Sequence, residues 1–269
     1  MIELNLTDYI LAESFFIKKK QYIPALSVVH GNFPGRVFIN QVHEPNLAIV
    51  WATGRWMYLE GSIKSEKDKI ELSTFIRDVV VPDCNQRNVN WFEIYTADVE
   101  YWDELFLEGI CISKVDKHYE SVYTLNLDKF NKIKNTFSPK LDDIEINLLE
   151  FLILPEEYHN LPYVEQKFQN KTCPGVELRK GSYLITICRN NGLVYKNEYF
   201  IDVDTFIQQQ RGKGYATLAS VRLIDHLLDK NMLPLWETTH QNAPSHKLAL
   251  KLGFEVEENY PVYVFLIES

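Results

Sequence analysis

The chain has no apolar run of about 18 or more residues, the length that a membrane-spanning helix requires. Its N-terminal stretch carries acidic groups early and no basic cluster before an apolar segment, so no secretory signal is predicted. Low-complexity tracts are also missing. With 269 residues, 46% of them hydrophobic and 24% charged, the chain can bury one large core or two small ones. We therefore expect a soluble protein with no membrane partner.

Cysteine is scarce, and the four cysteines do not form a C-x-x-C pair. Scattered thiols favour a reduced, cytoplasmic protein over a disulfide framework or a zinc site. No H-E-x-x-H spacing occurs among the histidines, so no metal site is predicted. The G-x-S-x-G motif of serine hydrolases is absent as well. The cysteines are Cys84, Cys111, Cys173 and Cys188.

Basic residues are outnumbered, with 28 Lys and Arg against 37 Asp and Glu and a net charge of −9. This balance argues against nucleic acid as the main partner. It mildly favours a cationic substrate, because clefts in an acidic protein can concentrate such a ligand.

The most informative stretch, residues 201–230, has the pattern of a strand, a glycine loop and a helix. Apolar and acidic residues alternate over 201–205, which is typical of a strand. From Gly214 onward, apolar residues recur at helical spacing. These residues are Leu218, Val221, Leu223, Ile224, Leu227 and Leu228.

The loop between them contains Gly212 and Gly214, which allow backbone N–H groups to approach a ligand directly. The helix that follows begins with unpaired N–H donors and a partial positive charge, so an anion is expected to bind there. The nucleotide motifs G-x-x-x-x-G-K-[ST] and G-x-G-x-x-G are both absent. The anion site is therefore of another kind.

Two motifs in register identify that kind. Arg211-Gly212-Lys213-Gly214-Tyr215-Ala216 matches Q/R-x-x-G-x-G/A, and Asn242 to Phe254 matches N-x-x-S-x-x-L-A-x-K-L-G-F. Both resemble signatures of the GNAT superfamily of N-acetyltransferases, most closely the branch that includes the zwittermicin A resistance protein. The resemblance covers roughly residues 175–269. It implies an α/β (α+β) GNAT acyl-CoA N-acyltransferase fold, a mixed central sheet flanked by helices.

The upstream pattern predicts an apolar strand over 182–188, a turn over 189–192 and a strand over 198–205. Downstream we expect a helix over 214–230, a strand over 234–238, a helix over 242–252 closed by Gly253, and a strand over 262–267.

The first half has the same order of expected elements: strand 54–61, helix 68–81, strand 90–95, helix 99–107 and strand 119–127. We therefore expect residues 1–130 to form a degenerate GNAT-like half on the substrate side. That half lacks the glycine loop and should not bind acetyl-CoA. Residues 131–174 are expected to be a linker and cap, partly helical over 141–170, and residues 175–269 the catalytic domain.

The resemblance also implies the site. Acetyl-CoA is the expected cofactor, and an oxyanion donor is expected from a backbone N–H near Thr205 and Phe206. Asn242 is expected to bond the pantetheine arm. The residues expected to bind the cofactor are Val203, Thr205, Phe206, Arg211, Gly212, Lys213, Gly214, Tyr215, Ala216, Asn242 and Ser245.

A protonated amine with a pKa of ~10.4 must lose a proton. Glu198 and Glu237 are the candidate general bases, because they are the acidic residues nearest to where the resemblance places the base. The alternative role is a solvated charge at the start of a strand for Glu198, and an edge-strand charge or a helix partner for Glu237. Ser245 is the candidate donor to the leaving thiolate, since Ala249 stands where many members carry tyrosine. Helix capping is its alternative role. Other candidate donors are Tyr215, Tyr260 and Tyr263.

These observations predict an acetyl-CoA-dependent N-acetyltransferase acting on an amine of a small molecule or peptide. Two alternatives stay open: a non-catalytic acetyl-CoA sensor or scaffold, and transfer of a larger acyl or aminoacyl group. The oligomeric state, monomer or homodimer, is open too.

Overall fold

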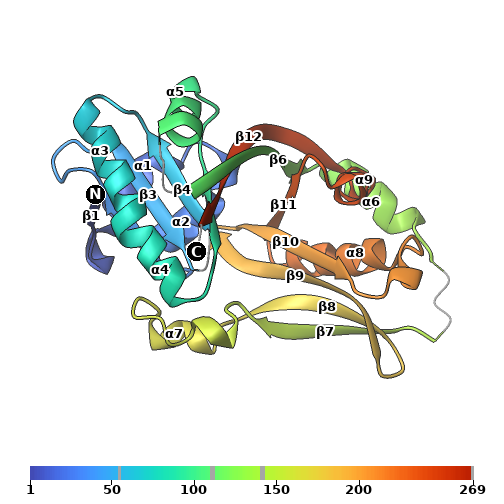
Figure 1. Cartoon of the computed structure of the whole chain (residues 1–269). Helices are drawn as coiled ribbons and strands as arrows, with labels where there is room; N and C mark the ends of the chain where they lie inside the picture. Colours follow the sequence, from blue (N-terminus) through green and yellow to red (C-terminus); the bar gives the residue numbers. More distant parts are fainter. Residues whose placement is uncertain (54–55, 110–112, 140–142, 268–269) are drawn as a thin grey trace. The chain divides into compact units, whose positions relative to one another are not determined.

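The computed structural model describes residues 1–53, 56–109, 113–139 and 143–267 (Figure 1). Its contacts divide the chain into two compact units. The first comprises Met1–Glu120 and Asn259–Ser269, and the second Ser121–Glu258. These limits do not coincide with the boundaries expected at residues 130 and 175. Among the described residues, no helix is long and apolar enough to cross a membrane.

The first unit is built on a sheet with strand order β1-β2-β3-β4-β5-β12. β2, β3 and β4 are antiparallel neighbours, whereas β4 and β5 run parallel and are joined through helices. Sheet and helices share one apolar core. The strands are β1 (Ile2–Glu3), β2 (Gly35–Ile39), β3 (Leu47–Ala52), β4 (Trp56–Gly61), β5 (Trp91–Tyr95) and β12 (Phe254–Ile267). The helices are α1 (Glu13–Phe16), α2 (Ile23–Val29), α3 (Glu66–Phe75), α4 (Val81–Gln86) and α5 (Glu100–Asp103), with π-helical turns at Ile76–Val80 and Glu104–Gly109 and 3₁₀ turns at Leu6–Ala12 and Lys20–Tyr22.

The second unit has the strand order β6-β11-β10-β9-β8-β7. Helix α8 packs along β8, β9 and β10, and it shares one apolar core with α6 and α9 (Figure 1). The strands are β6 (Ser113–Leu125), β7 (Glu145–Leu152), β8 (Thr172–Lys180), β9 (Tyr183–Tyr195), β10 (Glu198–Thr205) and β11 (Leu233–Thr239). The helices are α6 (Leu127–Thr136), α7 (Gln166–Gln169), α8 (Tyr215–Leu228) and α9 (Ala243–Leu252), with 3₁₀ turns at Glu156–Tyr158 and Gln208–Gln210.

Each sheet is completed by a strand from the other half of the sequence. In the first unit, Val262–Leu266 of β12 pair antiparallel with Trp91–Tyr95 of β5. In the second unit, β6 lies beside β11. The chain thus leaves the first unit within β6 and returns to it within β12. The two units also share an element order, antiparallel strands followed by a parallel pair that helices connect.

The predicted elements after residue 198 are confirmed: β10, α8, β11 and α9 fall within two residues of their expected limits. β12 is longer than predicted and starts directly after Gly253. In the first half, the helix expected over 68–81 is observed as α3, a π-helical turn and the start of α4. Part of the strand expected over 54–61 lies outside the described residues.

Two other predictions need correction. The turn expected over 189–192 lies inside β9, because the Asn190 side chain accepts the Gly192 N–H at 2.8 Å and the chain bulges without reversing. The described part of the segment 141–170, expected to be partly helical, is helical only at Glu156–Tyr158 and in α7. Its longest element is β7, which pairs with β8 along its whole length. Residues 131–174 therefore contribute most of α6, together with β7 and α7, to the second unit.

Three of the four cysteines, Cys84, Cys173 and Cys188, are free and buried. Burial raises the pKa of the Cys84 thiol to about 11, so it stays protonated at neutral pH. Cys111 lies outside the described residues.

A buried carboxylate closes the start of α3 in the first unit. Asp68 is 6% exposed and accepts hydrogen bonds from the N–H groups of Lys64 and Ser65 at 2.8 and 3.0 Å. The amides of Asn46 and Asn40 donate to it at 3.2 and 3.1 Å. Burial opposes ionisation, but these donors outweigh it and lower the pKa of Asp68. In the order of elements, α3 of the first unit corresponds to α8 of the second. The N-terminus of α3 is thus already occupied by the Asp68 carboxylate.

Asp68→Asn is expected to lower the free energy of unfolding by about 2 kcal/mol, because an amide cannot accept all four donors. Since the pKa of Asp68 is lower in the folded state, this stabilisation is present above the unfolded value of ~3.9 and is lost as pH falls through the folded value. Urea unfolding at pH 7 and pH 3 measures both effects. Glu66→Gln removes the same charge from the same turn at an exposed position, and an equal loss in both variants would contradict the assignment.

Candidate functional site

The loop between β10 and α8 ends in a helix start without a side-chain cap. Gly214 is the N-cap residue with φ of 88°, and no described side chain accepts from the first turn of α8. Gly212 has φ of 76°, and a Cβ added there would meet nothing within 4 Å. The first N–H groups of α8 are therefore available to a ligand, and the helix dipole favours an anion.

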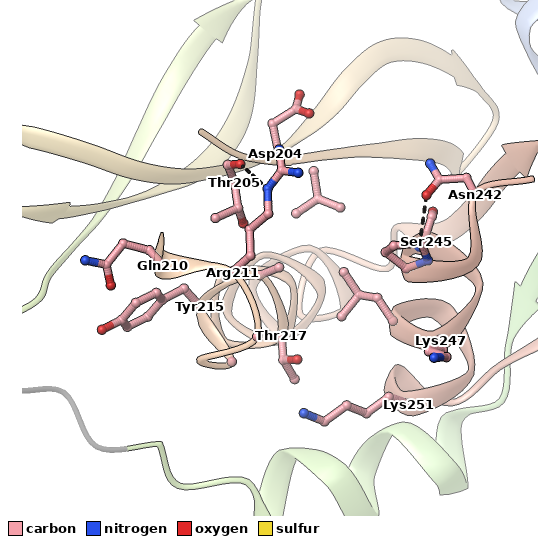
Figure 2. A pocket seen from close by; sticks show the side chains of 16 residues that line it. Asp204, Thr205, Gln210, Arg211, Tyr215, Thr217, Asn242, Ser245, Lys247 and Lys251 are labelled. Atoms are coloured by element: carbon pink, nitrogen blue, oxygen red, sulfur yellow. Dashed lines mark hydrogen bonds between the residues drawn. The ribbon is translucent and has the colours of Figure 1, made fainter. Parts of the chain in front are cut away.

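A cavity of about 680 Å³ lies at this helix start (Figure 2). This volume is within the ~300–1,000 Å³ range of small-molecule sites. Nine of the predicted cofactor-binding residues line it. They are Val203, Thr205, Arg211, Gly212, Gly214, Tyr215, Ala216, Asn242 and Ser245. Asp204, Gln210, Thr217, Pro244, Lys247, Leu248 and Lys251 complete the lining.

The remaining predicted site residues lie outside this lining. Phe206 is 54% exposed, and the Lys213 ammonium donates to the Gln210 side chain at 2.8 Å. Glu198 begins β10, seven residues before Thr205, which is about 23 Å along an extended strand. Glu237 is in β11.

β10 and β11 stop pairing before the part of β10 that lines the cavity, which leaves an opening between the two strands. Their parallel pairing covers Glu198–Phe200 and Leu233–Leu235, yet both strands continue, to Thr205 and Thr239. Successive residues of a strand point to opposite faces. Because Val203, Asp204 and Thr205 all line the cavity, the cavity reaches around the edge of β10 into this opening.

The hydrogen bond from Phe206 N–H to Ile185 O, at 2.9 Å, shows which backbone groups face β9. Alternate residues of an antiparallel strand turn the same way. The N–H groups of Val203 and Thr205 therefore face the opening, and Thr205 O accepts Arg211 Nε at 3.2 Å. Phe206 N–H is occupied by Ile185 O, so of the two residues named for the oxyanion donor only Thr205 directs its N–H into the opening.

Ser245 makes a contact that the sequence did not indicate. Trp236 Nε1 donates to Ser245 Oγ at 2.9 Å, and the indole is buried. The helix cap is Asn242, whose Oδ1 accepts from Ser245 N–H at 3.3 Å. The serine hydroxyl thus accepts one hydrogen bond and keeps its own proton for another partner. The capping role considered for Ser245 belongs to Asn242.

Of the alternative donors, Tyr215 lines the cavity. Tyr260 and Tyr263 belong to the first unit, where the Tyr263 hydroxyl donates to Asp103 at 2.7 Å.

Asp202 is a further carboxylate beside the opening, two residues past the last β10–β11 pair. Its side chain points to the face opposite the α8 core, since Tyr199, Ile201 and Val203 occupy the other face. Arg189 lies directly across on β9, 3.6 Å from its carboxylate, and 45% of the side-chain surface remains accessible.

Partial burial raises the pKa of Asp202; Arg189 opposes this and the negative Asp204 adds to it. Extending the β10–β11 register places Glu237 on the same face, on the neighbouring strand. The sequence contained the signal for Asp202, a carboxylate in the strand before the glycine loop. Alternation alone did not say which face was covered.

The mixed sheet, the splayed parallel strands and the uncapped glycine loop together define a GNAT-type fold. The model of the family described as GNAT acetyltransferase matches residues 14–263, and the chain belongs to this family. Membership supports transfer of an acyl group from an acyl-CoA donor to an amine-bearing acceptor. No curated protein matches the chain.

Solved structures share this fold. The GCN5-related N-acetyltransferase-like protein from Streptococcus suis 89/1591 superposes with a TM-score of 0.67 at 17% identity, covering 97% of this chain and 100% of that chain. A GCN5-related N-acetyltransferase from Sphaerobacter thermophilus has a TM-score of 0.59 at 12% identity, covering 100% and 96%. A tandem GNAT protein from the clavulanic acid biosynthesis pathway has a TM-score of 0.57 at 10% identity, covering 100% and 98%. The predicted GNAT fold with a GNAT-like N-terminal half is thereby confirmed.

Proposed function

We propose that this protein transfers the acetyl group of acetyl-CoA directly to an amine of a small molecule or peptide. One observation carries the proposal. A single cavity extends from the uncapped start of α8 to the opening between β10 and β11; Ser245 lines it, and the Asp202 carboxylate lies beside the opening. This arrangement suits an elongated ligand with an anionic middle and a reactive end.

The residues present fit acetyl-CoA. The free N–H groups at the start of α8 and the open space over Gly212 suit a pyrophosphate. The N–H groups of Val203 and Thr205 suit the pantetheine amides and the acetyl oxygen, because they face the opening and β11 no longer pairs with them. Oriented donors of this kind stabilise charge that develops on a carbonyl oxygen.

Acetyl-CoA, when bound, supplies the thioester carbonyl that the amine attacks. Asp202 is assigned as the general base that takes the ammonium proton, since its raised pKa brings it closer to a proton-accepting range than an ordinary aspartate. Glu237, on the same face of the sheet, is the second candidate: it passes the proton on from Asp202 or takes the place of Asp202 as the base. Glu198 is the weakest of the three candidates for the general base, because it lies where β10 and β11 are still paired.

Ser245 is assigned as the donor to the departing thiolate sulfur. Its hydroxyl lines the cavity, and the Trp236 indole N–H already satisfies one oxygen lone pair. This contact turns the hydroxyl proton away from the indole and polarises it towards donation. Asn242 fixes the first turn that carries the serine.

The first unit is assigned to choosing the amine, since its helix start is filled by Asp68 and offers no second anion site. The motif form shared with the zwittermicin A resistance protein and the net charge of −9 favour a cationic small molecule. A cytoplasmic location follows from the same proposal, because the free cysteines are reduced there.

Thiol release from acetyl-CoA in the presence of a panel of amines tests the function. Amine-dependent release with mass spectrometry of an acetylated product supports it. Binding of acetyl-CoA without release for any amine would favour a sensor or scaffold. Faster release from longer acyl-CoAs than from acetyl-CoA would favour transfer of a larger acyl group.

Ser245→Ala is expected to lower kcat about tenfold, with little change in KM for acetyl-CoA, because the lost hydrogen bond forms only as the thiolate leaves. Trp236→Phe keeps the ring and removes the N–H, and it should lower kcat by a smaller factor. Stopped-time thiol assays measure both. Leu250→Ala, at a 58% exposed position of the same helix, is the control. Unchanged kcat in Ser245→Ala would move the donor role to Tyr215 or water.

A further inference from the structure

Two lysines of α9 line the end of the cavity away from Asp204. Lys247 and Lys251 are four residues apart and so share one face of the helix. Figure 2 shows Lys251 extending past Thr217, at the opposite end of the view from Asp204. Within the described part of the chain, no carboxylate lies within 4.0 Å of either ammonium. In a chain with a net charge of −9, two such cations beside one cavity call for an anionic ligand.

An aromatic ring from outside both sequence motifs holds one of these lysines. The ring of Phe137, just after α6, lies 4.6 Å from the Lys251 ammonium. The same ring borders the glycine loop, since a Cβ on Gly214 would lie 3.0 Å from Phe137 Cζ. Phe137 therefore touches both the loop and Lys251. Phe137 is only partly buried.

The opening, the glycine loop and Lys251 follow one another along the cavity (Figure 2). In Figure 2, Arg211 and Tyr215 of the loop that suits a pyrophosphate lie between Asp204 and Lys251. A CoA molecule whose pyrophosphate binds the loop and whose thioester reaches the opening directs its adenosine 3′-phosphate the other way. A phosphate beside Lys251 makes a charge-assisted hydrogen bond, and a purine beside Phe137 buries apolar surface.

Resting on the proposed function, we propose that Phe137 and Lys251 form a subsite for the phosphorylated adenosine of CoA. Lys251 binds the 3′-phosphate, and Phe137 both positions the ammonium and contacts the purine. The protein accordingly selects free acyl-CoA over donors that carry only the phosphopantetheine arm. The segment between the two motifs thereby becomes part of donor recognition.

Isothermal titration calorimetry of the full chain with CoA and with 3′-dephospho-CoA tests the subsite without turnover. The wild-type protein is expected to bind CoA about tenfold more tightly than 3′-dephospho-CoA. Lys251→Met should weaken CoA about tenfold, leave 3′-dephospho-CoA nearly unchanged and so abolish the preference. Phe137→Ala should weaken both ligands. Lys230→Met, the same charge change on an exposed residue outside the cavity, should change neither.

Equal affinities of the wild-type protein for the two ligands would overturn the subsite, as would a preference that survives in Lys251→Met. No binding of either ligand to the wild-type protein would instead overturn the proposed function. Thermal unfolding of each variant shows that it is folded, and the exposed position of Lys251 makes Lys251→Met a mild change. If Phe137→Ala alone unfolds, Phe137→Leu keeps the apolar contact with the loop while removing the ring.

Discussion

Asp202→Asn is expected to lower kcat/KM for the amine by about 10²- to 10⁴-fold, the range that a general base contributes. The carboxylate lies beside the opening of β10 and β11, on the face that the α8 core leaves uncovered. Asparagine has nearly the same shape but takes no proton at neutral pH. Affinity for CoA should stay within about twofold, because Asp202 does not line the cofactor cavity.

The pH dependence of the same variant identifies the base. Since partial burial raises the pKa of Asp202, the acid limb of kcat/KM should lie above the ~3.9 of a free aspartate. Activity requires the ionised form, so kcat/KM falls as pH decreases through the raised pKa. This limb should vanish in Asp202→Asn. Glu237→Gln and Glu198→Gln are the matched comparisons, and an unaffected Asp202→Asn with an inactive Glu237→Gln would assign the base to Glu237.

Gly253→Ala is expected to lower the free energy of unfolding by about 3 kcal/mol. Gly253 ends α9 with φ of 96°, a conformation that disfavours any side chain. A Cβ there would also lie 2.7 Å from Phe130 N and 2.9 Å from Lys129 Cβ of α6. Neither atom is the free end of a flexible side chain, so the backbone of α6 must move.

Gly181→Ala is the matched control for Gly253→Ala. Gly181 also has a positive φ, 55°, but a Cβ there meets nothing within 4 Å. The control should therefore lose only the conformational part, about 1 kcal/mol. Denaturant unfolding with equal slopes for the variants measures the difference. Equal losses at both positions would show that the contact with α6 has no energetic weight.

The elements around the site that were predicted correctly from the sequence are those set by local chemistry. Gly212 and Gly214 predicted the loop and Gly253 predicted the end of α9, and all three have positive φ in the structure. The contact between Trp236 and Ser245 could not be predicted, because it joins a strand and a helix in three dimensions. The uncovered face beside Asp202 is likewise a property of packing, which alternation along one strand cannot reveal.

The incorrect predictions have a similar origin. The segment from Asn190 to Gly192 is rich in turn residues. The Asn190 side chain accepts a hydrogen bond from Gly192 N–H, however, and the strand continues. The apolar stretch Glu145–Leu152 has no clear alternation, and it becomes a strand because β8 offers an open edge. In both cases the neighbouring strand decided between two local structures of similar cost.

The exchange of β6 and β12 affects how the chain can fold while it is being synthesised. When a ribosome has released the first 130 residues, β5 has no outer neighbour, because Val262–Leu266 do not yet exist. An unpaired strand edge is a template for aggregation. The first unit can close its sheet only when residues 262–266 emerge, so the nascent protein keeps an open strand edge until they have been synthesised.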